Sequence, residues 1–140
     1  MRIAIDVMGG DHAPDAILDG ALSALDLLGQ GDQLILVGDQ HVIEETVCEK
    51  GLAGDPRLAV EPTTEVVDMD ETPVDALRTK PDSSIARIGW LGSRRSRDKQ
   101  ADVILSAGNT GACVAAAQMA MRRLPNVHRP GIAVTMPTFH

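Results

Sequence analysis

Apolar residues along the chain form short β-branched runs that alternate with stretches of helical spacing. The runs predict strands, which we expect at residues 2–7 (RIAIDV), 33–37 (QLILV), 58–61 (LAVE), 102–106 (DVILS) and 132–136. The run at 33–37 is apolar throughout, which is typical of a strand covered on both faces.

Between these runs, apolar side chains recur three and four residues apart, as on one face of a helix. The expected helices cover residues 14–28, 40–50, 73–79, 83–99 and 110–123. Gly89 and Gly92 weaken the fourth, and small residues open the fifth, which would let it lie close to a sheet. The alternation predicts a three-layer α/β fold with a mostly parallel sheet.

The end of the sequence is unusual for such a fold. Only four residues follow the last expected strand, so no helix is available to cover it. We therefore expect residues 1–140 to be a truncated, N-terminal part of one larger α/β domain. The alternative is an edge strand at a natural terminus.

Charge is distributed unequally along the 140 residues, whose net charge is −7. Residues 1–77 carry 3 basic and 17 acidic side chains, whereas residues 78–140 carry 10 basic and 3 acidic ones. The basic half predicts an anionic partner. One Phe, one Trp and no Tyr leave few platforms for base stacking, which argues against nucleic-acid binding.

The sequence also indicates the cellular compartment in which we expect the protein. Its longest nearly apolar stretch, 111–121, is about half the roughly 20 residues of a membrane span, and the N-terminus lacks a signal peptide's apolar segment. Cys48 and Cys113 form no disulfide framework, so we expect reduced thiols in a cytoplasmic protein. The four histidines lack metal-ligand spacing, and we expect neither metal nor cofactor.

Candidate chemistry lies where the strands end, because open parallel sheets bind ligands at their carboxyl ends. The first such segment contains Gly9, Gly10, Asp11 and His12 and leads to Pro14. Its glycines allow close approach of a ligand, while Asp11 and His12 bring a carboxylate and an imidazole to the rim. The alternative is a tight strand-to-helix turn that Asp11 caps.

A second segment follows the fourth strand and combines small residues, hydroxyls and a helix start. It contains Ser106, Gly108, Asn109, Thr110 and Gly111. This composition is typical of a phosphate cradle, although the spacing matches neither a P-loop nor a dinucleotide loop. The alternative is a glycine turn in which Asn109 is left-handed and Thr110 caps the helix.

A third segment places Lys80 just before Ser83 and Ser84, which can cap a helix. A lysine ammonium, serine hydroxyls and free amide groups together favour phosphate. The alternative is a basic turn in contact with water only.

These motifs, in this order, resemble a known family. The stretches are RIAIDVMGGDHAP at residues 2–14, LVGD at 36–39, MDETP at 69–73, SAGNTGA at 106–112 and MPT at 136–138. They resemble the bacterial phosphate acyltransferases of phospholipid synthesis, the PlsX family. The resemblance spans the whole chain, but the family is much longer and its second half has no counterpart here. The segment between Ser84 and Asp102, with Trp90, departs from the family's more acidic pattern.

The resemblance implies an enzyme that converts long-chain acyl-[acyl carrier protein] and orthophosphate to acyl phosphate and free carrier protein. It implies a fold similar to phosphotransacetylase and to the isocitrate and isopropylmalate dehydrogenases. Such proteins are cytoplasmic homodimers that associate with the membrane surface. They pass acyl phosphate to a membrane glycerol-3-phosphate acyltransferase, PlsY. The second half would supply further active-site residues.

For this reaction we expect phosphate to attack the thioester carbonyl with no covalent enzyme intermediate. Lys80 and the two serines after it would bind phosphate, and the second segment would line the same cleft. Asn109 would donate a hydrogen bond to the oxyanion or to phosphate. Asp11 would border the entry of the acyl chain, and His12 is a candidate acid for the leaving thiolate.

A basic cluster is the candidate docking surface for the acidic carrier protein. It contains Arg87, Arg94, Arg95, Arg97 and Lys99, and the alternative is a solvated helix face. Three rival functions remain. They are a truncated chain without catalysis, a module that only binds phosphate or acidic proteins, and a nicotinamide dehydrogenase, for which a dinucleotide loop is missing.

Overall fold

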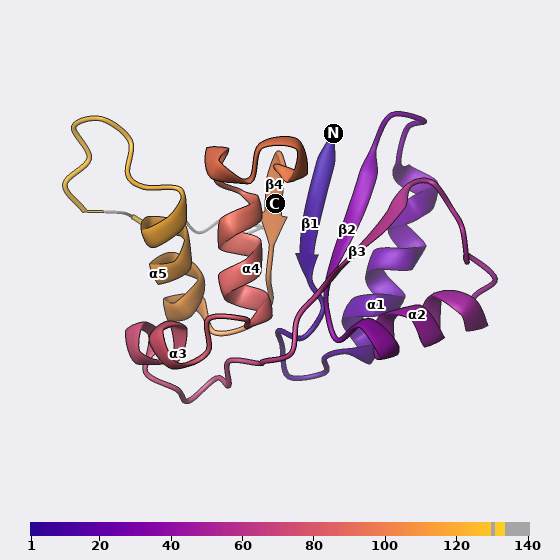
Figure 1. Cartoon of the computed structure of the whole chain (residues 1–140), viewed down its shortest axis with the longest axis horizontal. Coiled ribbons are helices and arrows are strands. Elements are labelled where there is room, and N and C mark those ends of the chain that lie inside the picture. Colours follow the sequence, from indigo (N-terminus) through magenta and orange to yellow (C-terminus); the bar gives the residue numbers. More distant parts are fainter. Residues whose placement is uncertain (130, 134–140) are drawn as a thin grey trace, which may run out of the picture.

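The computed structural model describes residues 1–129 and 131–133. These residues form a parallel sheet of four strands in the spatial order β3–β2–β1–β4, with helices on both sides (Figure 1). The strands are β1 (Arg2–Asp6), β2 (Gln33–Gly38), β3 (Leu58–Pro62) and β4 (Val103–Leu105). The predicted α/β fold with a parallel sheet is therefore confirmed.

Five α-helices and two short 3₁₀ helices connect and extend the strands of the described residues. They are α1 (Asp15–Ser23), η1 (Ala24–Leu27), α2 (Gln40–Glu49), α3 (Pro73–Thr79), α4 (Ser84–Leu91), η2 (Arg94–Lys99) and α5 (Thr110–Ala120). None of the helices in this part of the chain has the length and apolar character needed to cross a membrane.

Alternate residues of β1 and β2 build two separate cores, because successive strand side chains point to opposite faces of a sheet. Ile5 pairs in register with Leu36, and both join the core that α1 and α2 cover. Ala4 and Ile35 point to the other face and pack with Ile88 of α4. The sheet is thus covered by different helices on its two sides.

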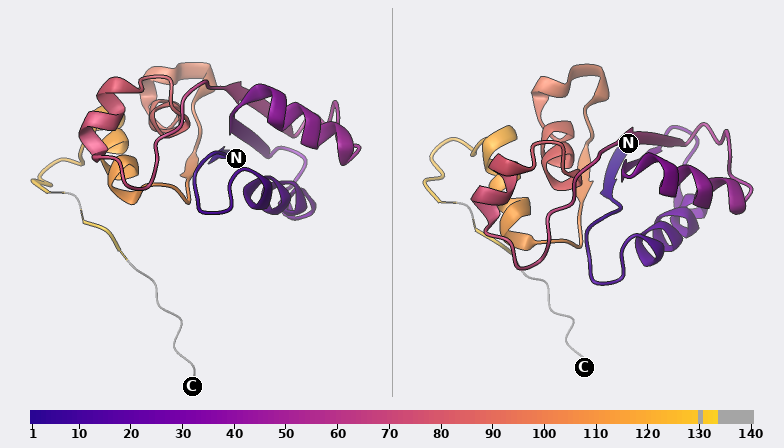
Figure 2. Two further views of the ribbon diagram at one scale, coloured as in Figure 1. Left: turned by 90° about the horizontal axis from the view of Figure 1, so that it is seen from below. Right: turned by 60° about the horizontal axis from the view of Figure 1, so that its bottom comes forward.

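Helix α5 forms an outer layer that packs mainly against α4 and α3 (Figure 2). The two helices approach closely at Gly89 of α4, where a Cβ would lie 3.1 Å from the Cβ of Ala116. The small residues of α5 therefore serve helix–helix packing, and the expectation that they lie against the sheet is wrong.

Three expected helices end earlier than their apolar spacing predicts. The first divides into α1 and η1, and the one expected to reach Lys99 ends at Leu91, where Gly92 follows. The chain then continues as η2, with Arg97 at a φ of 50°. Helix α5 ends at Ala120. Residues 132 and 133 are outside any strand, and the rest of the expected last strand, 134–136, lies outside the described residues.

Candidate functional site

The carboxyl ends of β1 and β4 bring the first two candidate segments into contact. A Cβ built on Gly9 would lie 2.9 Å from the backbone nitrogen of Gly108 and 2.4 Å from Oδ2 of Asp6. Since real Cβ atoms do not approach other atoms so closely, only glycine fits at position 9 without displacing its neighbours. The two loops therefore touch through their backbones.

A buried carboxylate joins these loops. Asp6, at the end of β1, is 0% exposed, and its Oδ2 accepts a hydrogen bond from Oγ of Ser106 at 2.7 Å. Its Oδ1 accepts the backbone N–H of Met8 at 3.1 Å. Oγ of Ser106 in turn accepts the N–H of Gly108 at 3.1 Å. One carboxylate thus fixes the start of both segments.

The rim of the first segment is open to solvent. Asp11 and His12 are exposed, and Gly10 has a φ of 128°, a conformation that side chains rarely adopt. The carbonyl of His12 accepts the N–H of Ala16, so the residue lies where α1 begins. Both side chains therefore lie at the same edge of the sheet as the two glycine loops, free to meet a bound molecule.

Asn109 is the N-cap of α5, and its side chain is fully used by the backbone. Its Oδ1 accepts the N–H of Ala112 at 3.0 Å. Its Nδ2 donates to the carbonyls of Asp68 and Glu71, both at 3.1 Å, and of Met69 at 3.3 Å. Because the residue is only 6% exposed, its amide holds the 68–71 loop against the second segment.

Its neighbours in the second segment differ in exposure. The side chain of Thr110 is exposed at the first position of α5. Gly111 packs against α3, since a Cβ there would lie 2.6 Å from Cγ of Pro73. Thr110 is therefore available to a ligand, and Gly111 allows the helices to approach one another.

Lys80 lies in an acidic environment at the end of α3. Its Nζ forms an ion pair with Glu71, lies 3.9 Å from Oδ2 of Asp68, and donates to the carbonyl of Val66 at 2.7 Å. The hydrogen bond that Lys80 donates to the Glu71 carboxylate raises the pKa of Lys80. Oε2 of Glu71 is buried without a partner in the described residues. Glu71 thus connects two candidate segments. Its backbone carbonyl accepts a hydrogen bond from Asn109 of the second segment, and its carboxylate pairs with Lys80 of the third.

The two serines of the third segment are buried at the start of α4. Ser83 is 0% exposed, and its Oγ caps the helix by accepting the N–H of Ala86 at 3.4 Å. Ser84 is 1% exposed, and its backbone N–H donates to the carbonyl of Glu65 at 3.3 Å. Both residues hold the helix start in place beneath the surface.

The predicted docking cations divide into two groups. Arg87 pairs with Asp82 at 2.8 Å and with Glu61 at 3.5 Å, and Lys99 pairs with Glu61 at 2.9 Å. The side chains of Arg94, Arg95 and Arg97 are exposed. They follow the C-terminal end of α4, so the eight residues of that helix, about 12 Å, separate them from Ser83.

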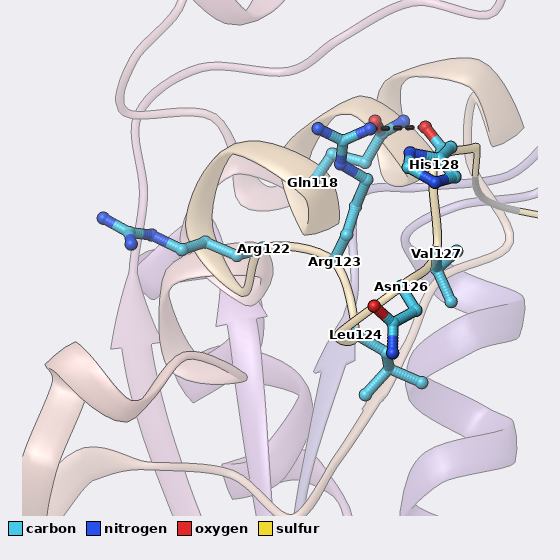
Figure 3. A pocket seen from close by; sticks show the side chains of 7 residues that line it. All are labelled: Gln118, Arg122, Arg123, Leu124, Asn126, Val127 and His128. Atoms are coloured by element: carbon cyan, nitrogen blue, oxygen red, sulfur yellow. Dashed lines mark hydrogen bonds between the residues drawn. The ribbon is translucent and has the colours of Figure 1, made fainter.

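Two cavities lie at the far end of α5 from Asn109. One, of about 570 Å³, is lined by four arginines, Arg94, Arg95, Arg122 and Arg123, among others. The other, of about 490 Å³, is drawn in Figure 3, where Arg123 donates to the backbone carbonyl of His128 and Arg122 points away. This end of the molecule is strongly basic and remote from the glycine loops.

Two residues of the candidate site, Asp6 and Glu71, were missed by sequence reasoning. A carboxylate at the end of an apolar strand, shortly before a glycine pair, was the available signal for Asp6.

The Cys113 thiol lies near this carboxylate. Burial raises the pKa of the Cys113 thiol, as does the charge of Asp6, while Ser106 lowers it. Within the described residues, His, Cys, Asp and Glu side chains form no group of three or more that could hold a metal.

Comparison with known proteins gives a consistent result. The model of a family described as "Fatty acid synthesis protein" matches residues 1–140. Among curated proteins, the chain is 39% identical over 137 residues to a protein of Salinibacter ruber named phosphate acyltransferase. It is 42% identical over 138 residues to the phosphate acyltransferase of Alkalilimnicola ehrlichii, and 41% identical over 138 residues to that of Heliobacterium modesticaldum.

These alignments cover different shares of the two partners. They include 98% of this chain for the first protein and 99% for the other two, but 39% of each relative. The chain therefore spans about two fifths of the length of the curated relatives that it matches.

Proposed function

The chain belongs to the family described as "Fatty acid synthesis protein", and we propose that it carries part of the site of a phosphate acyltransferase. In the proposed reaction, an oxygen of orthophosphate attacks the thioester carbonyl carbon of a long-chain acyl-[acyl carrier protein]. The C–S bond then breaks, which gives acyl phosphate and the carrier protein's thiol. The residues of this chain bind and orient phosphate and provide a proton for the leaving sulfur.

The junction of the Gly9 and Gly108 loops is the observation that carries this proposal. It lies at the carboxyl ends of two neighbouring parallel strands, beside the first turn of α5. Amide groups at a helix start and the positive end of the helix dipole favour an anion. We assign phosphate to this junction, where the exposed Thr110 hydroxyl adds a donor and Ser106 lines the site.

Lys80 supplies positive charge at the same edge. Its ammonium group is already paired with the Glu71 carboxylate, which raises the pKa of Lys80. In the proposal, phosphate competes with Glu71 for Lys80, while the buried Ser83 and Ser84 support the helix start behind it. Asn109 acts mainly by fixing the 68–71 loop, because its amide hydrogens point to backbone carbonyls.

The leaving group departs on the open side of the junction. His12 is exposed at the rim and is the assigned acid for the thiolate, and Asp11 with Gly10 borders the entry of the acyl-pantetheine arm. Protonation of the sulfur favours C–S cleavage, because a neutral thiol is a better leaving group than a thiolate.

The carrier protein would dock on the basic end of the molecule. Exposed arginines, Arg94 and Arg95, lie there beside the larger cavity, about one helix length from the phosphate site. The pantetheine arm would bridge this distance. A homodimer, a cytoplasmic location at the membrane surface and transfer of acyl phosphate to PlsY complete the proposal, which requires no cofactor.

An acyl phosphate assay tests this function. The purified chain receives long-chain acyl-[acyl carrier protein] and orthophosphate, and hydroxylamine traps acyl phosphate as a hydroxamate. We expect hydroxamate that depends on phosphate, with release of free carrier thiol in equal amount. Hydroxamate formation that is the same with and without phosphate would contradict the proposal.

A second candidate function is a module that binds phosphate or acidic proteins without catalysis. The four arginines around the 570 Å³ cavity favour it, because they form a basic surface remote from the glycine loops. This candidate predicts binding of the carrier protein or of phosphate with no phosphate-dependent hydroxamate.

A further inference from the structure

The hydroxyl of Ser106 has a defined polarity at the proposed phosphate site. Asp6, the buried carboxylate behind it, takes part in no step of the proposed reaction. A serine hydroxyl has one proton to donate and two lone pairs that accept. In this structure the proton is donated to Oδ2 of Asp6 at 2.7 Å, and one lone pair accepts the N–H of Gly108 at 3.1 Å. Ser106 therefore has only an acceptor left for a ligand.

The surrounding packing keeps this arrangement in place. Asp6 is completely buried, and its other oxygen is occupied by the N–H of Met8. Gly9 lies directly against Oδ2, where a Cβ would be 2.4 Å away. The carboxylate and the hydroxyl thus have little freedom to exchange roles.

We propose that Asp6 is a positioning residue that makes Ser106 a hydrogen-bond acceptor, so that the site selects protonated phosphate and rejects sulfate. Near neutral pH phosphate carries at least one P–OH group, which can donate to Ser106, whereas sulfate carries no proton. An acceptor lone pair attracts the first anion and repels the second. This inference rests on the proposed function, because it assumes that phosphate occupies the Gly9–Gly108 junction.

The variant Asp6→Asn reverses the polarity of Ser106 with almost no change of shape. The new amide oxygen can still accept the N–H of Met8, while the new Nδ2 donates to Oγ of Ser106. That oxygen then accepts two hydrogen bonds, and its proton becomes available to a ligand. In the variant, Ser106 presents a hydrogen-bond donor to the ligand, and oxygens of both phosphate and sulfate can accept this hydrogen bond.

The test is an NMR titration of the ¹⁵N-labelled chain with sodium phosphate and with sodium sulfate at equal ionic strength. In the wild type we expect phosphate to shift the amide signals of Gly108 and Thr110 and to bind at least about tenfold more tightly than sulfate, the factor of one hydrogen bond. In Asp6→Asn we expect the two dissociation constants to approach each other. Asp102→Asn is the matched control, because this carboxylate accepts a backbone N–H from Arg2 at the other end of the sheet.

Each outcome decides between the two proposals. Wild type that binds neither anion at the junction overturns the proposed function and this inference together. Binding of phosphate with equal affinity for sulfate, or a folded Asp6→Asn variant that keeps the wild-type preference, overturns the inference alone. If the NMR spectrum of Asp6→Asn loses its dispersion, the variant is unfolded, and Ser106→Ala and Ser106→Thr test the inference instead. The inference predicts that Ser106→Ala binds phosphate more weakly than the wild type and that Ser106→Thr, which keeps a hydroxyl, binds it as the wild type does. An equal loss of phosphate binding in both variants would contradict the inference.

Discussion

The backbones of Gly9 and Gly108 lie in contact although 99 positions separate them in the sequence, and a Cβ on Gly9 would be 2.9 Å from the nitrogen of Gly108. This contact aligns the loops that follow β1 and β4. It also closes the space around the Asp6 carboxylate, so the geometry of the candidate site depends on the absence of a side chain at position 9.

The first prediction concerns that position. Gly9→Ala should lower the free energy of unfolding by about 1–3 kcal/mol, because the new methyl group overlaps the buried carboxylate and the facing loop. It should also weaken phosphate binding. Urea denaturation and phosphate titration measure the two effects.

Gly20→Ala is the matched control, since a Cβ at position 20 of α1 meets nothing within 4 Å. It should raise the free energy of unfolding by about 0.5–1 kcal/mol through helix propensity and leave phosphate binding unchanged. Equal stability of Gly9→Ala and the wild type would show that the two loops are not in contact.

A second prediction separates the two roles of Asn109. Asn109→Asp keeps an oxygen for the cap of α5 but removes the donor to the carbonyls of Asp68 and Glu71. We expect a loss of about 1–3 kcal/mol from the unpaired groups, and faster hydrogen exchange confined to the 68–71 loop. Asn109→Ala should be less stable still, because it also loses the cap, worth about 0.5–2 kcal/mol. An Asn109→Asp variant with wild-type exchange in that loop would be inconsistent with the structure.

The third prediction is a pH dependence at Asp55. The side chain of Arg57 donates to this carboxylate at 2.6 Å and holds its pKa at about 2, below the ordinary 3.8. Because the folded state has the lower pKa, the pair stabilises the fold fully above pH 4 and loses its effect as the pH falls toward 2.

Comparison of Asp55→Asn with the wild type checks this dependence. The difference in free energy of unfolding between them should be present at pH 7 and shrink below pH 4. Asp19→Asn, which removes an exposed partner of Lys50, serves as the control. A carboxyl titration of Asp55 by NMR with a midpoint near 3.8 would disprove the assignment.

The fourth prediction addresses carrier-protein docking. Charge reversal in Arg94→Glu should weaken binding of the acidic carrier protein several-fold at low salt, and the effect should decrease as salt screens the surface. Phosphate binding should stay unchanged, because Arg94 lies at the other end of α4 from Ser83. Lys50→Glu makes the same charge change at the end of α2 and should have no effect. Equal binding by wild type and Arg94→Glu would remove this surface from the proposal.

Local patterns predicted β1, β2, β3 and β4 to within one residue at each end, whereas residues 132 and 133 of the fifth expected strand are outside any strand. Helix ends were less predictable where 3₁₀ turns replace the last α-helical turns, as at η2, which follows Gly92 and Ser93. The packing of α5 was predicted wrongly, since small residues indicate close approach but do not identify the neighbour. Here the neighbour is Gly89 of α4 rather than a strand.

The candidate site was only partly predictable for a related reason. Topology places the strand ends together, so the meeting of the two glycine loops follows from the fold class. The pairing of Lys80 with Glu71, the burial of Ser83 and the donation from Ser106 to Asp6 depend on tertiary packing. No spacing in the sequence reports those contacts.

The most direct test of the central claim measures phosphate-dependent acyl hydroxamate formation by the wild type, Lys80→Met and Glu71→Gln. The proposal predicts hydroxamate from the wild type and an increased KM for phosphate in Lys80→Met, which lacks the cation. It predicts a lowered KM in Glu71→Gln, where the carboxylate no longer competes with phosphate for Lys80. A rate that is independent of phosphate, or identical in all three proteins, would contradict the assignment of this edge of the sheet to phosphate.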